Sequence, residues 1–285
     1  MKKPIVVIVC LTVVLPFSLV FGQRGHYETV EKEFKASTDR PLEVLLKVDV
    51  GEVLVEKGTD ERTGTVTIRY KTQKFRQQID FDENRNRLKI YFDMKGLKNV
   101  NTDEDPAEVS LKLPYGVDIL FDSKIKAGEV RMEMGGLRLR EFSLTTWAGD
   151  VEVRFDEPNP IVMDFFDVDA KVGELRLVEI GNARFEKADI NGGIGEIDID
   201  FTGKFVSGSK AKVDLDIGEA KILLPRDAGI QMSIGGGFSF LSQKNVDGSL
   251  YKRGRSYYSE DFEDSRSKFY LRITPGLGEL NVDRE

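Results

Sequence analysis

Short runs in which apolar and polar residues alternate make up most of this chain, as in the segment EIDID at residues 196–200. Alternation with a period of two predicts half-buried β-strands, because successive side chains of a strand point to opposite faces. After residue 22, no segment keeps a helical period of apolar residues for more than about two turns. The pattern therefore predicts an all-β protein.

A five-residue pattern that begins with glycine recurs seven times. In each copy an acid follows the glycine, then an apolar residue, any residue and a second apolar residue, as in GELRL at residues 173–177. The glycines are Gly51, Gly128, Gly149, Gly173, Gly195, Gly218 and Gly278. The five central copies recur at intervals of about 21–24 residues, a spacing typical of coils that stack on one another. We therefore predict a single-stranded β-solenoid with coils of about 21–24 residues.

Around each glycine the apolar positions step by three residues instead of two. In the fourth copy, Val172 lies one residue before Gly173 and Leu175 lies two residues after it. Because a straight strand sends alternate residues to one face, we expect the chain to turn at the glycine so that both apolar residues face one interior. Glycine suits such a corner, since it adopts positive φ without a clash of Cβ. The acid that follows, here Glu174, is then expected to point outward.

The segment at residues 1–22 has the pattern of a secretory signal peptide. Lys2 and Lys3 give a positive start, an apolar run follows, and the run ends at Gly22, where a signal peptidase could cut. An uncleaved membrane anchor is the alternative, because about 18 mostly apolar residues approach the length of a membrane span. We favour cleavage and export, to the periplasm or cell envelope or as a secreted protein.

The rest of the chain divides into a lead-in at residues 23–40 and the solenoid at residues 41–285. The two longest intervals between repeat glycines, from Gly51 to Gly128 and from Gly218 to Gly278, interrupt the series. Each interval contains a strand that ends in Leu-Pro, as expected for a residue that cannot donate to a β-ladder. Residues 41–285 therefore form either one stack or two tandem blocks, 41–120 and 121–285.

Charge and composition narrow the chemistry. The formal net charge is −7, and the chain has one cysteine, Cys10, and one histidine, His26. Cleavage after residue 22 would remove Cys10, so the mature chain would have no disulfide and no thiolate chemistry. A single histidine near the terminus argues against zinc sites and His-dependent triads. The acidic balance disfavours nucleic acid as a partner, and we expect no cofactor.

The repeat resembles the toast-rack family of exported bacterial proteins, which are often described as adhesins or as domains of unknown function. The likeness rests on the glycine-acid-apolar coils, the Leu-Pro strand ends, the early VDVGEVLVEKG and the closing GLGELNV, and it covers residues 41–285. The C-terminal domains of cell-wall-active antibiotic response proteins have the same coil pattern. The resemblance implies a right-handed β-helix, and it supplies no catalytic residues.

The acids that follow the glycines are the first candidate site. They are Glu52, Glu129, Asp150, Glu174, Glu196, Glu219 and Glu279. In coils about 4.8 Å apart, such a column would repel itself unless cations relieve the repulsion. Five basic residues are expected to point outward beside it: Lys126, Arg131, Lys171, Arg176 and Lys221. We favour exposed ion pairs, which need contribute little, and keep calcium bridging as the alternative.

Closely spaced aspartates are the second candidate site. Enzymes that cleave polysaccharides use paired carboxylates in a groove, and residues two apart on a strand share a face. The aspartates are Asp164, Asp167, Asp169, Asp198, Asp200, Asp214 and Asp216. The polar outer face of a half-buried strand explains all of them without catalysis. We therefore predict a protein that is not an enzyme, and a polysaccharide-active enzyme is the alternative.

A charged loop at residues 251–264 is the third candidate. Its proposed binding residues are Tyr251, Arg253, Arg255, Tyr257 and Tyr258. Loops carry binding sites more often than regular walls do, and tyrosine rings can stack on sugars or on a protein. Elsewhere, the single tryptophan, Trp147, is expected to point outward and to pack on Phe166 or another side chain of the next coil.

Together these features predict an exported, non-enzymatic protein of the cell envelope with an adhesin-like binding or scaffold surface. The expected partner is an envelope protein or a surface glycan. Contact with a membrane is expected only through residues 1–22, if that segment stays uncleaved.

Overall fold

The computed structural model describes residues 27–96, 107–235 and 243–285. The predicted signal peptide at residues 1–22 and His26 lie outside the described residues. In the described part, the regular elements are β-strands and one short 3₁₀ turn, η1 (Ile180–Ala183), so the all-β prediction is confirmed. No helix in these three segments is long and apolar enough to cross a membrane.

The strands fall into a lower group, a middle stack and an upper group. The lower strands are β1 (Tyr27–Lys35), β2 (Leu42–Val50), β3 (Glu52–Lys57), β4 (Thr63–Lys71), β5 (Phe75–Asp82), β6 (Arg87–Met94) and β7 (Glu108–Leu113). The middle strands are β8 (Asp118–Ala127), β9 (Val130–Glu133), β10 (Arg138–Ala148), β11 (Val151–Arg154), β12 (Met163–Val178), β13 (Phe185–Asp200) and β14 (Ser209–Leu224). The upper strands are β15 (Gly229–Ile234), β16 (Gln243–Val246), β17 (Leu250–Arg253), β18 (Ser256–Ser259), β19 (Lys268–Thr274) and β20 (Leu277–Arg284).

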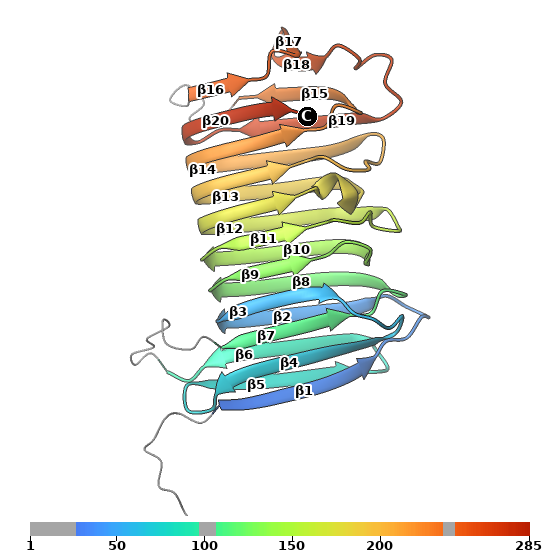
Figure 1. Cartoon of the computed structure of the whole chain (residues 1–285), viewed down its shortest axis with the longest axis vertical. Coiled ribbons are helices and arrows are strands. Elements are labelled where there is room, and N and C mark those ends of the chain that lie inside the picture. Colours follow the sequence, from blue (N-terminus) through green and yellow to red (C-terminus); the bar gives the residue numbers. More distant parts are fainter. Residues whose placement is uncertain (1–26, 97–106, 236–242) are drawn as a thin grey trace, which may run out of the picture.

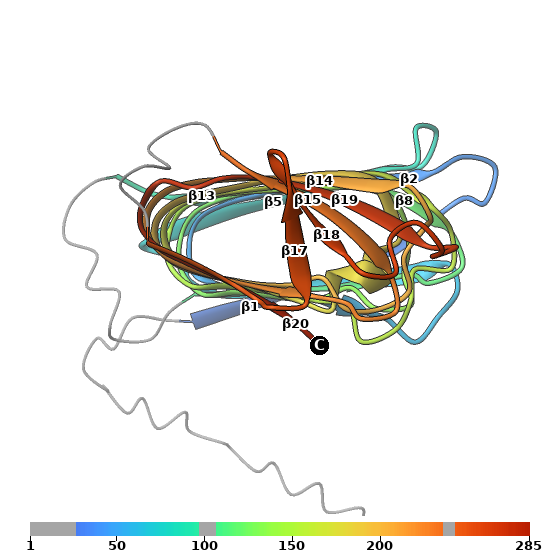
Figure 2. The same ribbon diagram turned by 90° about the horizontal axis from the view of Figure 1, so that it is seen from above.

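Successive coils stack in parallel along one long axis (Figure 1). On one broad side the pairing order is β6–β2–β8–β10–β12–β13–β14–β19–β15. On the other side it is β7–β3–β9–β11–β12–β13–β14–β20–β16. The long strands β12 to β14 turn the corner and belong to both sides. Viewed from above, the coils superpose as a flattened oval (Figure 2), an arrangement compatible with the predicted solenoid.

The two long intervals in the repeat are excursions to the ends of the stack. Strand β2 lies between β6 and β8, so Val50 pairs with Ala127 although strands β3 to β7 lie between them in the chain. At the other end Gly218 pairs with Gly278 across the second interval. Segments far apart in the chain therefore form neighbouring coils, and the repeat glycines follow one another in a single column.

The repeat glycines have φ angles from 120° to 153°, a region that L side chains rarely adopt. Each coil also passes too close to the next for a side chain there. A Cβ at Gly173 would lie 2.0 Å from the carbonyl oxygen of Gly149. The same contact of 1.8–2.0 Å with the preceding glycine recurs at Gly128, Gly149, Gly195, Gly218 and Gly278. Both the backbone conformation and the stacking distance therefore require glycine.

The core is a column of apolar side chains from successive coils. The residues two positions after the glycines are at most 5% exposed: Val53, Val130, Val151, Leu175, Ile197, Ala220 and Leu280. A file of phenylalanines lies beside them, with Phe142 stacked between Phe121 at 5.6 Å and Phe166 at 5.1 Å. This inside assignment agrees with the expectation from sequence, and it accounts for the strict apolar character of these positions.

The expectation that the residue before each glycine also faces the interior was wrong for most copies, although Val50, in the first copy, is half-buried against the core. Val172, Ile194, Ile217 and Leu277 are 49, 52, 48 and 37% exposed. The chain does turn at the glycine, but the turn directs the two residues before it outward, so the interior resumes only two positions after it. Trp147 lies in the same outward stretch and is 46% exposed, so its expected outward direction is confirmed. Phe166 is fully buried, so of the packing partners expected for Trp147 only another side chain of the next coil remains.

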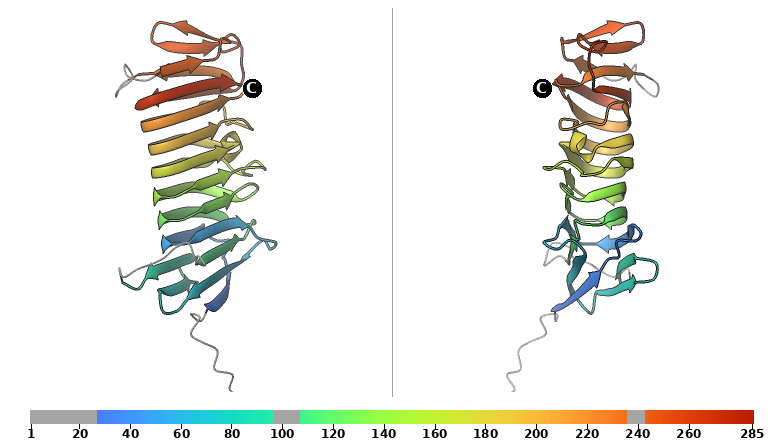
Figure 3. Two further views of the ribbon diagram at one scale, coloured as in Figure 1. Left: turned by 60° about the vertical axis from the view of Figure 1, so that its left-hand side comes forward. Right: turned by 90° about the vertical axis from the view of Figure 1, so that its right-hand side faces the viewer.

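Different antiparallel elements cover the two ends of the stack (Figure 3). At the lower end, β1 pairs with β4 and β5 pairs with β6, and Phe34 contacts Phe81 at 5.4 Å between ring centroids. At the upper end, β18 pairs with β15 and β17 pairs with β18. Figure 2 shows β17 lying across the end of the oval. Such end structures shield the last apolar layer of a stacked fold.

Candidate functional site

Three of the seven acids after the corner glycines, Glu129, Glu174 and Glu219, lie beside outward-pointing cations. Arg176 contacts Glu174 at 3.9 Å on its own strand and Glu152 and Asp198 at 3.6 and 4.0 Å on the neighbouring strands. The same relation joins Arg131 to Glu129 at 3.8 Å and Lys221 to Glu219 at 3.2 Å. The repulsion between acids on successive coils is therefore offset at these three positions by basic side chains. Among the residues described, no group of three or more His, Cys, Asp or Glu is placed to hold a metal ion.

Most of the closely spaced aspartates also have ion-pair or hydrogen-bond partners. The ammonium of Lys212 donates to Asp214. Burial works against the charged form of Asp214, but the hydrogen bonds from Lys212 and Thr274 outweigh it and lower its pKa. The other pairings are Lys171 with Asp169 at 2.7 Å, Arg140 with Asp164 at 3.5 Å and the backbone N–H of Thr202 with Asp200 at 2.7 Å. A carboxyl with a lowered pKa, such as that of Asp214, is poorly suited to donate a proton as a general acid.

Asp167 differs from the other aspartates. It lies in a surface groove of about 590 Å³ that Asp122, Ser143 and Phe165 also line. Burial raises the pKa of Asp167, and neighbouring carboxylates, of which Asp189 has the largest effect, raise it further. The hydroxyl of Ser143 donates to Asp167 at 3.2 Å and acts in the opposite direction. A carboxyl with a raised pKa in a groove is the one feature of the aspartate set that suits acid catalysis.

An exposed row of aliphatic side chains follows the corner. It consists of Ala148, Val172, Ile194, Ile217 and Leu277, and we call it the aliphatic row. Parallel register places Ile194 directly between Val172 and Ile217. The acids after the glycines border the row on one side. Contiguous exposed apolar side chains of this kind mark interaction surfaces more often than isolated ones do.

The tyrosines of the third candidate site lie on a hairpin rather than a loose loop. Tyr251 of β17 pairs with Tyr258 of β18, and their rings stack at 6.0 Å between centroids. The ring of Tyr258 meets Phe262 edge-on at 5.3 Å. Tyr257 points to the opposite face of the hairpin, where Lys252 lies 5.5 Å from its ring centroid. Two of the three proposed tyrosines therefore share a face. The two arginines of the set, Arg253 and Arg255, are exposed next to the turn.

The face that Tyr251 and Tyr258 share continues onto the stack below. Tyr258 pairs with Gln231, Gln231 with Tyr270, and Tyr270 with Lys210. The next column of the same strands holds Arg253, Ser256, Ser233 and Arg272. We call Tyr251, Tyr258, Tyr270, Gln231, Lys210, Arg272 and Arg253 the basic tyrosine face.

Sequence reasoning missed Tyr270, Gln231, Lys210 and Arg272, because strand register decides that they meet the hairpin. One signal was present in the sequence. Tyr251 and Arg253 have the same spacing as Tyr270 and Arg272, and residues two apart on a strand share a face.

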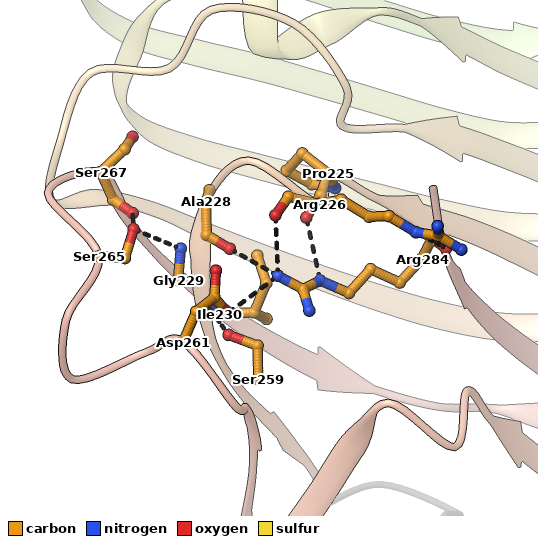
Figure 4. Close-up of polar contacts among 10 residues, drawn as sticks. All are labelled: Pro225, Arg226, Ala228, Gly229, Ile230, Ser259, Asp261, Ser265, Ser267 and Arg284. Atoms are coloured by element: carbon orange, nitrogen blue, oxygen red, sulfur yellow. Dashed lines mark hydrogen bonds and ion pairs between the residues drawn. The ribbon is translucent and has the colours of Figure 1, made fainter.

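Arg284 holds the connections around this upper end in place (Figure 4). Its guanidinium donates to the carbonyl oxygens of Pro225, Arg226 and Ala228 at 3.1–3.2 Å and to Asp261 at 3.1 Å. The hydroxyl of Ser259, on the hairpin, accepts from the backbone N–H of Ile230 at 2.9 Å, and that of Ser265 accepts from Gly229 at 3.0 Å. These hydrogen bonds fix the hairpin against β15 and so place the basic tyrosine face.

Solved structures with low sequence identity are similar to this chain over most of its length. A "putative cell adhesion protein" from Clostridium sporogenes has 14% identity and a TM-score of 0.45, over 90% of this chain and 100% of that one. A "putative adhesin" from Bacteroides fragilis has 10% identity and a TM-score of 0.45, over 92 and 100%. A "putative lipid binding protein" from Parabacteroides distasonis has 9% identity and a TM-score of 0.25, over 92 and 98%. Curated proteins gave no match.

The match to a protein-family model assigns the family, which the weak structural similarities do not. Residues 23–173 match the N-terminal domain of toast_rack, DUF2154. The matched segment is more than half of the 285 residues, and it includes the first four repeat glycines. The resemblance inferred from the glycine-acid-apolar coils is thereby confirmed, and the chain belongs to the toast-rack family.

Proposed function

We propose that this chain is an exported, non-enzymatic protein of the cell envelope, a β-solenoid of the right-handed β-helix type with an adhesin-like binding or scaffold surface. The observation that carries the proposal is the aliphatic row. Its members Val172, Ile194 and Ile217 are each about half exposed and lie in register over consecutive strands. Leaving such a row in water forgoes about 25 cal/mol for each Å² that a partner would cover.

The position of the aliphatic row indicates that it contacts a partner and does not stabilise the fold. The core is complete without it, because Leu175 and Ile197, two positions after the glycines, are at most 5% exposed. A smaller polar residue would satisfy the corner equally well, since these side chains make no part of the interior. An interaction surface is the explanation that uses their apolar character.

The state of the carboxylates supports a binding role over catalysis. Asp164, Asp169 and Asp214 have cationic partners, and hydrogen bonds from partners including Lys212 hold the pKa of Asp214 low. Exposed ion pairs of this kind are what the polar outer face of a half-buried strand carries without any catalytic role. The expectation of export comes from the sequence of residues 1–22.

The test compares binding of the full chain and a row variant to washed cell envelopes from the native host. The variant is Ile194→Asn with Ile217→Asn, and the matched control is Val162→Asn, an apolar residue 37% exposed outside the row. We expect the wild type and the control to sediment with the envelopes and the row variant to stay in the supernatant. Equal sedimentation of all three, or an uncut chain retained in the cytoplasmic fraction, would contradict the proposal.

A polysaccharide-active enzyme is the second candidate, and Asp167 is the observation that favours it. The groove around Asp167 is open and the pKa of its carboxyl is raised, mainly by burial. Its test is the release of reducing ends from acidic and neutral polysaccharides by the full chain. Release that disappears in Asp167→Asn would establish an enzyme and overturn the non-enzymatic proposal.

A further inference from the structure

The basic tyrosine face concentrates positive charge on a chain whose net charge is −7. Lys210, Arg272 and Arg253 are exposed, and in the described segments none of the three has a carboxylate oxygen within 4.0 Å. Lys212, by contrast, contacts both Asp214 and Asp189. Three cations without ion-pair partners on one face provide an electrostatic attraction for an anion.

The same face presents tyrosine rings in register. Tyr251 lies opposite Tyr258, and Gln231 lies between Tyr258 and Tyr270. Tyr251 is 44% exposed, while Tyr258 and Tyr270 are half-buried. Half-buried rings have fixed orientations, because the edge contacts of Phe262 with Tyr258 at 5.3 Å and with Tyr270 at 6.1 Å hold them. They form a preorganised apolar surface with polar hydroxyls.

A shallow groove lies beside Tyr270, Lys210 and Arg272. It has a volume of about 230 Å³, and its lining includes Lys210, Gln231, Ser233, Ser256, Tyr270 and Arg272. Two cations, one amide and two hydroxyls therefore surround one aromatic wall. Binding sites for small polar groups typically combine an apolar wall with a few convergent polar side chains in this way.

We propose that the basic tyrosine face binds an acidic polysaccharide, with tyrosine rings against the faces of the sugar rings and Lys210 and Arg272 against their carboxylates. Arginine binds a carboxylate through two parallel hydrogen bonds. Strands lie about 4.8 Å apart, so Tyr251 and Tyr258 are one strand spacing apart and Tyr258 and Tyr270 are two, distances comparable with one and two sugar residues. The carbohydrate chain would run along the stacking axis, across β14, β19, β15 and the hairpin.

The geometry favours a polysaccharide over other polyanions. A membrane surface is bound by side chains that insert into it, whereas Tyr258 and Tyr270 are half-buried and held by Phe262. A nucleic acid would extend beyond the three cations. Its phosphates would then lie over the carboxylates of an acidic chain, which repel them. The inference that the natural ligand is a glycan of the cell envelope rests on the proposed function. The inference that this face binds an acidic polysaccharide does not.

The experiment is calorimetric titration of the purified full chain with polygalacturonate and, as the neutral counterpart, dextran. We expect polygalacturonate to bind with an affinity that falls as salt is raised, and dextran not to bind. Lys210→Gln with Arg272→Gln should weaken binding about tenfold, as loss of charge-assisted contacts does. Tyr251→Ser, on an exposed ring of the outermost strand, should weaken it several-fold and keep the fold intact.

Arg131→Gln and Tyr115→Ser are the matched controls, since both residues are exposed and lie outside the face. They should bind as the wild type does. Equal binding of dextran, no binding of polygalacturonate, or an equal loss in the controls would overturn the proposal. Tighter binding of single-stranded DNA or of anionic vesicles would likewise overturn it and assign the face to another partner. None of these outcomes bears on the aliphatic row, so the envelope test of the proposed function stands separately.

Discussion

The guanidinium of Arg284 donates to the carboxylate of Asp261 at 3.1 Å, and this contact joins the final strand of the stack to the loop that follows the tyrosine hairpin. The side chain of Arg284 is only 10% exposed, whereas that of Asp261 is 46% exposed. Arg284 thus acts as a buried donor for backbone carbonyls as well as an ionic partner. The upper end of the stack depends on it more than on Asp261.

Arg284→Ala is expected to destabilise the upper end by about 1–3 kcal/mol, because the part-buried carbonyl oxygens of Pro225 and Ala228 lose their donor. Hydrogen exchange should show the loss at β17 and β18, with the middle strands β12 and β13 unchanged. The matched variant Arg226→Ala, at an exposed residue whose guanidinium donates to the carbonyl of Arg284 at 3.3 Å, should leave exchange as it is. Equal exchange of the hairpin in wild type and Arg284→Ala would contradict the role given to Arg284.

A loss of stability in acid is expected from Asp261. Burial opposes ionisation, but the hydrogen bond from Ser259 and the charge of Arg284 outweigh it and lower the pKa of Asp261. A group with a lowered pKa in the folded state stabilises the fold above its unfolded pKa of about 3.9, and that contribution is lost as pH falls through the folded value. Comparison of thermal unfolding with Asp261→Asn should show a difference at neutral pH that vanishes below about pH 3.

Gly173→Val is expected to prevent folding or to cost more than about 4 kcal/mol. The new Cβ would lie 2.0 Å from the carbonyl oxygen of Gly149, at a φ of 124° that a β-branched residue tolerates poorly. Gly248→Ala is the control, because nothing lies within 4 Å of a Cβ there. Denaturant unfolding measures both. A Gly173→Val variant as stable as wild type would remove the requirement for glycine at the corner.

Leu175→Ala is expected to lower the free energy of unfolding by about 2–5 kcal/mol, as truncations of buried leucine do. Leu175 is 2% exposed, whereas Val172 on the other side of the glycine is 49% exposed. Val172→Ala should therefore change stability by less than about 0.5 kcal/mol. Urea midpoints of the two variants test this directly. Similar losses in both would restore an interior position for Val172.

Glu174→Gln is expected to change stability by less than about 0.5 kcal/mol, because its contact with Arg176 at 3.9 Å is exposed. Calcium should likewise leave the melting temperature unchanged. An ion raises it only by binding the folded state, and no group of acids among the described residues is placed to hold one. Differential scanning fluorimetry with calcium and with a chelator measures the effect. A rise with calcium that is absent in Glu174→Gln would establish the calcium column instead of ion pairs.

The alternation of apolar residues made the all-β prediction secure. It also gave the inside positions two and four after each glycine, because a strand has a period of two and the buried face of every coil must be apolar. Leu175 and Leu177, for example, are 2 and 1% exposed. The family could be inferred too, since seven copies in phase are a property of the sequence alone.

The pairing of strands brings together residues that are far apart in the sequence. Tyr270 and Gln231 lie on the same face as Tyr251 because β19, β15, β18 and β17 are neighbours, and no local pattern states which strands pair. The same holds for Gly51 beneath Gly128, since strands β3 to β8 lie between the two in the chain. Hydrogen bonds between strands are made by backbone groups that every residue carries, so the order of strands is decided by the packing of whole coils.

The sequence by itself determined the strand class, the repeat, the buried column and the glycine positions, because each depends on the period of a strand or on the absence of a Cβ. Only the tertiary structure decided which way Val172, Ile194 and Ile217 point, since the direction of a corner depends on backbone angles at several residues and on the coil that stacks above it. It also decided which distant strands share a face. For that reason the aliphatic row and the basic tyrosine face, both of them surfaces assembled from several coils, became visible only in the folded chain.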